Sequence, residues 1–102
     1  MPTEDKWCQV GDLVTLSDSV TAVAAAPYQL DNSCYVIAAG LEDGSVQLLT
    51  WHPDQGWTRS HVHQPHHATV TRLLWRPAST VNNSLLASSS ADTSVRIMRV
   101  NM

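Results

Sequence analysis

The sequence predicts an all-β fold made of about two blades of an incomplete β-propeller, and three observations support this prediction. The first is an internal repeat, in which landmark residues recur at offsets of 49 or 50 positions. The second is a hairpin turn at Glu42-Asp43-Gly44-Ser45, because Asp-Gly between apolar runs tolerates the positive φ that tight turns need. The third is the lack of helical periodicity, since prolines interrupt every candidate helix.

Two pairs of matching segments carry the repeat. Val20–Pro27 and Val70–Pro77 are short apolar runs that end in proline, 50 positions apart. Ala39–Leu48 matches Ser88–Ile97 at an offset of 49. Self-similarity at this spacing is typical of propellers, whose four-stranded blades recur at roughly 40–50 residues.

The first unit is long enough for four strands. Its second and third strands are joined by the Asp43-Gly44 turn, and residues 52–56 form the next loop because they are rich in residues that interrupt strands. The predicted strands are Val20–Ala26, Cys34–Ala39, Ser45–Trp51 and Trp57–His63.

The second unit supplies only three strands, predicted at Thr69–Trp75, Ser84–Ser88 and Ser94–Val100. A further strand is predicted at Trp7–Leu16, before the first unit. We therefore divide the chain into the outer strand of a preceding blade (1–17), a complete blade (18–64) and a blade without its outer strand (65–102). Since a propeller closes with about four blades or more, we expect this chain to depend on neighbouring blades.

Composition argues against several classes of function. The chain has 102 residues, a net charge of −3 and six scattered basic residues, so it lacks the basic stripe that tracks phosphates. Cys8 and Cys34 form no disulfide framework or CxxC pair. No apolar run approaches the ~20 residues of a membrane span, and the polar start of the chain does not resemble a signal peptide. We expect a cytoplasmic protein, with the nucleus as a second location, and no membrane partner.

A histidine cluster is the strongest alternative for a metal site. His61 and His63 share one face of a predicted strand, and His66 and His67 follow closely. Pro65 interrupts the strand geometry, and neither cysteine lies nearby in the sequence. We favour a polar outer strand and loop, and predict no metal ligands and no cofactor.

Ser88, Asp92 and His66 also invite comparison with a hydrolase. Nucleophilic catalysis needs a serine presented on a sharp turn with an oxyanion hole, as in G-x-S-x-G. The sequence contains no such motif, so we predict structural hydrogen bonding for these residues and no catalytic residues.

Aromatic residues provide candidate contact points for partners. Trp75 lies in a predicted inner strand and is expected to pack in the core. Trp7, Trp57 and Arg59 flank or occupy outer strands, and Trp and Arg are enriched at interaction hot spots. We take these three residues as a candidate interface.

The second unit resembles the WD40 repeat. His66 stands four positions before Val70, Leu85–Ser88 matches the second strand, and Asp92 matches the turn aspartate. The resemblance implies a structural hydrogen-bond network through His66, Ser88 and Asp92, with Asp43 as the turn aspartate of the first unit. Pro65 replaces the usual glycine, and Met98 replaces the tryptophan that completes the network.

Residues 18–102 also resemble a narrower family of WD40 scaffolds, the second subunits of Elongator complexes. The resemblance depends mainly on the Ala39–Gly44 stretch and the Arg-Val-Asn sequence at 99–101. It implies a non-catalytic scaffold that contacts the large first subunit and the catalytic third subunit. Such a scaffold supports tRNA wobble-uridine modification of the 5-carboxymethyl type and meets tRNA only through the complex. A WD40 adaptor of another pathway, which binds a peptide, remains the alternative.

Overall fold

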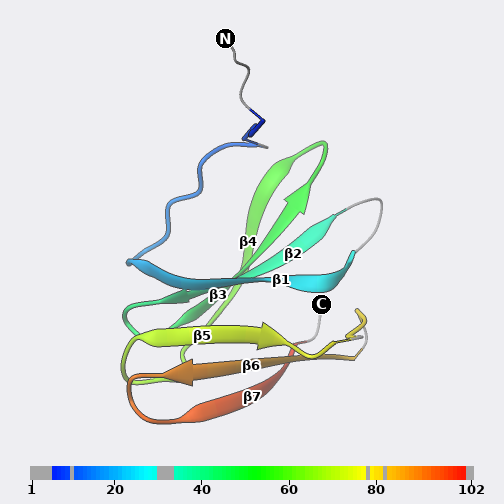
Figure 1. Cartoon of the computed structure of the whole chain (residues 1–102). Helices are drawn as coiled ribbons and strands as arrows, with labels where there is room; N and C mark the ends of the chain where they lie inside the picture. The colour runs from blue at the N-terminus through cyan, green and yellow to red at the C-terminus, as the bar shows by residue number, and fades with distance from the viewer. Residues whose placement is uncertain (1–5, 10, 30–33, 78, 82, 101–102) are drawn as a thin grey trace.

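The computed structural model describes residues 6–9, 11–29, 34–77, 79–81 and 83–100. These residues form two antiparallel sheets that lie face to face (Figure 1). The first sheet contains β1 (Val20–Gln29), β2 (Tyr35–Leu41), β3 (Val46–His52) and β4 (Gly56–His63) in that order, and the second contains β5 (Val70–Trp75), β6 (Ser84–Ser90) and β7 (Val95–Val100). Helices are absent from the described residues, so the all-β prediction is confirmed.

Both sheets contain a hairpin whose turn has the same chemistry. Between β2 and β3, the Oδ1 atom of Asp43 accepts hydrogen bonds from the backbone N–H and the hydroxyl of Ser45, at 2.9 and 2.5 Å. Between β6 and β7, Asp92 and Ser94 repeat these bonds with the same two distances. A short acidic side chain that bonds to the backbone two residues ahead stabilises such turns. Because the repeat places this aspartate at both positions, 49 residues apart, both sheets contain an equivalent hairpin.

Strand β1 continues beyond its predicted end at Ala26 and passes through Pro27 to Gln29. Proline lacks the N–H that a central strand must donate, but β1 lies at the edge of its sheet. The pairing with β2 is irregular between Ala25 and Gln29, where Pro27 lies. The proline therefore disturbs the register locally without ending the strand.

The strand predicted at Trp7–Leu16 is not formed by the described residues of this segment. Residues 6–9 and 11–19 form no strand, although Ser19 accepts a backbone hydrogen bond from Glu42. The Arg59 guanidinium donates to the carbonyl oxygen of Thr15, and Gly11 lies against the indole of Trp51. A strand exists only where a neighbouring backbone pairs with it, and neither sheet forms a ladder with this segment.

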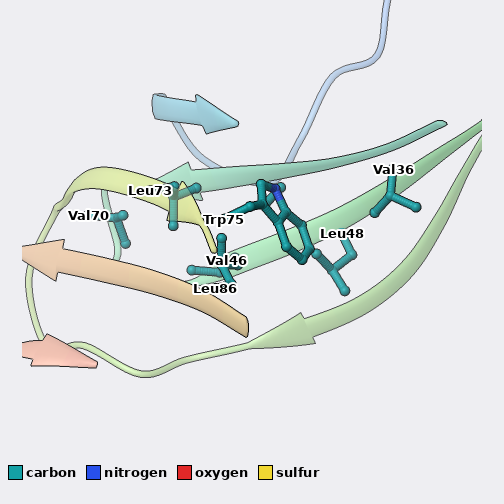
Figure 2. Packing of buried hydrophobic residues seen from close by; sticks show 8 residues of the cluster. Val36, Val46, Leu48, Val70, Leu73, Trp75 and Leu86 are labelled. Atoms are coloured by element: carbon teal, nitrogen blue, oxygen red, sulfur yellow. The ribbon is translucent and has the colours of Figure 1, made fainter. Parts of the chain in front are cut away.

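The core lies between the two sheets, as Figure 2 shows. Each sheet contributes apolar side chains to one buried cluster, whose members are Val36, Ala38, Val46, Leu48, Val70, Leu73, Trp75 and Leu86. The sheets approach closely at Gly40, where an added Cβ would lie 2.5 Å from Val70 Cγ1. Burial of this apolar area is the main force that holds the blades together.

The part of the chain that the structure describes contains no helix long and apolar enough to cross a membrane.

Candidate functional site

His66 is the centre of a buried polar network in the second sheet. The imidazole is 1% exposed, and its Nε2 atom lies 2.8 Å from the Ser88 hydroxyl on β6. Its Nδ1 atom lies 3.0 Å from the Ser94 hydroxyl and 3.3 Å from Asp92 Oδ2. The structure therefore brings His66, Ser88 and Asp92 together. The network links the segment before β5 to the middle of β6 and to the β6–β7 turn.

Asp92 carries the charge of this network. The Ser94 hydroxyl, followed by the backbone N–H of His67 at 3.0 Å, holds the pKa of the Asp92 carboxyl well below its usual range. Hydrogen bonds to the charged form favour that form. Asp92 is therefore a carboxylate at neutral pH, and it anchors both the turn and the loop that carries His66.

The arrangement of Ser88, His66 and Asp92 has the distances of a catalytic triad but cannot act as one. Ser88 and His66 are each 1% exposed, so a substrate cannot reach the serine oxygen. A nucleophilic serine must meet its substrate beside an oxyanion hole. These three side chains can instead form hydrogen bonds with one another inside the sheet, where a buried polar atom without a hydrogen-bond partner would lower the stability of the fold.

Asp43 lies apart from this network, in the turn of the first sheet. Its carboxylate bonds to Ser45, and this interaction lowers the pKa of Asp43. Leu16 stands four positions before Val20, where His66 stands before Val70, so the first blade has no histidine to complete a network. The Asp43 turn instead touches the neighbouring loop through backbone, because its carbonyl oxygen accepts a hydrogen bond from Gln64 at 3.1 Å.

Ser94 is a member of the network that the sequence reasoning missed. It bonds to Asp92 and faces His66 Nδ1. The signal was present, because Asp-x-Ser occurs at the same turn in both units, as Asp43-Gly44-Ser45 and Asp92-Thr93-Ser94. Met98, at the position of the usual tryptophan, packs against the core and adds no hydrogen bond to the network.

The histidine cluster does not gather as a metal site in the part of the chain that is described. Among those residues, no three His, Cys, Asp or Glu side chains lie close enough to share an ion. The side chain of His61 lies outside the described part. Cys34 pairs with another residue, since its sulfur lies 3.1 Å from His52 Nδ1.

The candidate interface residues occupy different environments. Trp57 is half-buried against Trp51, with ring centroids 5.3 Å apart, and Arg59 is exposed beside it. Both line a cavity of about 320 Å³ between the β3–β4 hairpin and residues 11–15. Trp7 does not line this cavity and is 90% exposed. The structure thus joins Trp57 and Arg59 and leaves Trp7 separate.

The fold has the features of WD40-type propeller blades. Two antiparallel sheets stack on an apolar interface, their hairpins share equivalent aspartate turns, and one sheet contains a buried histidine network. The chain is similar to Elongator complex protein 2 of Danio rerio, with 34% identity over 74 residues that make up 64% of this chain and 9% of that protein. It is also similar to Elongator complex protein 2 of Mus musculus, with 27% identity over 85 residues, 76% of this chain and 10% of the mouse protein. No protein-family profile matches the chain. The chain spans about a tenth of the length of these curated relatives.

Proposed function

We propose that this chain is a non-catalytic scaffold segment of an Elongator complex. The observation that carries the proposal is its similarity to two vertebrate proteins named Elongator complex protein 2. The fold supports a scaffold because the Ser-His-Asp group is closed off inside a sheet and serves packing. Blade faces and rims are surfaces for binding other proteins, and propeller proteins commonly use them in this way.

The surfaces available for subunit contacts are the apolar sheet faces and the Trp57–Arg59 cavity. Val23 and Ile97 lie on opposite outer faces of the sheet pair, exposed by 65% and 66%. Exposed apolar surface rimmed by polar groups is typical of interaction sites. The proposed partners are the large first subunit and the catalytic third subunit, in the cytoplasm and also in the nucleus. Through them the chain would support tRNA wobble-uridine modification.

Affinity purification from cells tests the proposal. The chain carries a small tag, and co-purified proteins are identified by mass spectrometry. We expect the first and third Elongator subunits, with recovery reduced roughly tenfold by Arg59→Glu because Arg anchors contribute strongly at interfaces. Arg72→Glu, an exposed site on β5, is the matched control and should leave recovery unchanged.

Recovery of a different set of proteins without any Elongator subunit would contradict the proposal and favour the adaptor alternative. Confocal imaging of the same tagged chain tests its location, and confinement to a membrane compartment would contradict that part.

A further inference from the structure

A pair of tryptophans lies on the β3–β4 hairpin, in the middle of the chain. Trp51 and Trp57 are directly opposed across the two strands, and their ring centroids are 5.3 Å apart with the ring planes tilted by 55°. Both side chains are half-buried, and a backbone hydrogen bond from Gln55 to His52 at 3.2 Å closes the turn between them. The paired strands therefore hold both rings side by side in the wall of the Trp57–Arg59 cavity.

Three hydrogen-bond donor groups at this cavity lack an acceptor among the described residues. They are the indole N–H groups of Trp51 and Trp57 and the side-chain amide of Gln55. The buried Trp75 differs from them, because its indole N–H donates to Ala24. A tryptophan that is half-buried at a surface offers a partner an apolar ring and a donor at once. The cavity therefore suits a ligand that has several acceptors and few donors of its own.

Residues 11–15 form the opposite wall of the cavity. They are held against the hairpin at two points, since the Arg59 guanidinium donates to the Thr15 carbonyl oxygen and Gly11 lies against the indole of Trp51. This wall adds the exposed carboxylate of Asp12. Arg59 already has a backbone acceptor, and Asp12 repels anions, so the cavity does not favour an acidic segment.

Proline matches these groups better than other residues do. It has no backbone N–H that would need an acceptor. Consecutive prolines adopt the polyproline II conformation, in which the backbone carbonyl oxygens have no internal partner. Such segments bind grooves lined by aromatic rings, and they lose little conformational entropy because their bound conformation is already formed.

We propose that the Trp57–Arg59 cavity binds a proline-rich segment of a partner protein in the polyproline II conformation. The prolines pack on Trp51 and Trp57, and the two indole N–H groups and the Gln55 amide donate to the carbonyl oxygens of the segment. A basic residue beside the prolines pairs with Asp12. The inference rests on the proposed function to the extent that this cavity is one of its contact surfaces.

Isothermal titration calorimetry of the full chain with synthetic peptides tests the proposal. The probe is a run of prolines between terminal arginines. One control peptide replaces the prolines by glycine and serine, and another replaces the arginines by glutamates. We expect the probe to bind roughly tenfold more tightly than the glycine-serine peptide, because only the prolines are preformed and pack on the rings. The glutamate-flanked peptide should bind roughly threefold less tightly than the probe, because Asp12 repels it.

Two matched tryptophan variants locate the site. Trp57→Ala should weaken binding of the probe roughly tenfold, as expected for a central aromatic anchor. Trp7→Ala removes an indole that is 90% exposed and lies outside the cavity, so it should leave binding unchanged. Because Trp57 is half-buried, circular dichroism checks that its variant is folded.

Two variants at exposed positions test the polar contacts without disturbing the packing of the hairpin. Gln55→Ala should weaken binding of the probe roughly threefold, through the loss of one hydrogen bond. Asp12→Asn should reduce the difference between the arginine-flanked and glutamate-flanked peptides. If Trp57→Ala does not fold, these two variants decide whether the cavity is the site.

Four results would overturn the proposal. They are absence of binding by the probe, equal binding of the glycine-serine peptide, tighter binding of the glutamate-flanked peptide, and equal losses from Trp57→Ala and Trp7→Ala. Co-purification of Elongator subunits without peptide binding would contradict this inference alone. Peptide binding without co-purified Elongator subunits would contradict the proposed function alone.

Discussion

The indole N–H of Trp75 donates a hydrogen bond to the carbonyl oxygen of Ala24, 3.0 Å away on the other sheet. Tyr28 packs edge-on against the same indole, with ring centroids 6.1 Å apart. The Tyr28 hydroxyl accepts a hydrogen bond from Ser84, which extends the contact to β6. Apolar burial brings the sheets together, and these directional contacts between β1 and the second sheet determine how they align.

Trp75→Phe should destabilise the chain by about 1–3 kcal/mol, because it removes the bond to Ala24 and part of a buried ring. Urea unfolding followed by circular dichroism measures this loss. Tyr28→Phe, which removes only a hydroxyl from the same cluster, is the control and should cost about 1 kcal/mol or less. Equal losses for the two variants would mean that the bond between the sheets contributes little.

Ser88→Ala should cost about 1–3 kcal/mol, because it leaves the buried Nε2 atom of His66 without its partner. The neighbouring Ser89, whose hydroxyl bonds to Thr71 at the surface, provides the matched control. Ser89→Ala should change the free energy of unfolding by about 0.5 kcal/mol or less. If thermal melts show equal shifts for the two variants, the network does not stabilise the second blade.

The stability of the chain should depend on the ionisation of Asp92. Its pKa is lowered in the folded chain, chiefly by the Ser94 hydroxyl. The unfolded chain therefore binds the proton more readily, and the stabilisation is present above the ordinary pKa of 3.8 and is lost as pH falls below it.

Asp92→Asn removes this dependence, since an amide does not titrate in this range. We expect the stability difference between wild type and Asp92→Asn to be largest near neutral pH and to shrink as the pH drops below 3.8. Urea midpoints of both proteins across this range measure the effect. A difference that stays constant with pH would show that the charge of Asp92 has no role.

Thr93 occupies a backbone conformation that suits glycine, with φ at 72°. Its counterpart in the first sheet is Gly44, with φ at 92°. A β-branched residue at positive φ is strained, so Thr93→Gly should stabilise the chain by about 0.5–1 kcal/mol after the entropy cost of glycine.

The reverse change, Gly44→Thr, should destabilise the chain more strongly. It introduces the same strain, and its Cβ would meet the backbone of His66 in the neighbouring loop. Thermal melts of the two variants should shift in opposite directions, and shifts of the same sign would contradict this account of the turns.

Most of the fold could be predicted because its signals are local or periodic. The Asp43-Gly44 turn is a property of a few adjacent residues, and the repeat places the equivalent turn at Asp92. The grouping of His66, Ser88 and Asp92 followed from the resemblance, whereas the part played by Ser94 did not. A hydroxyl two residues after an aspartate has many partners open to it, and only the folded loop placed His66 within 3.0 Å.

The sequence by itself determined the strand class, the turns and the two-unit organisation, because backbone preference and apolar periodicity act over short distances. Only the tertiary structure decided that Pro27 lies within an edge strand, that residues 11–16 form no strand, and that Trp75 bonds to Ala24. Each of these depends on which backbone or side chain lies opposite. A hydrogen-bonding group pairs with a group that the folded chain places beside it, and a short stretch of sequence does not determine which group that is.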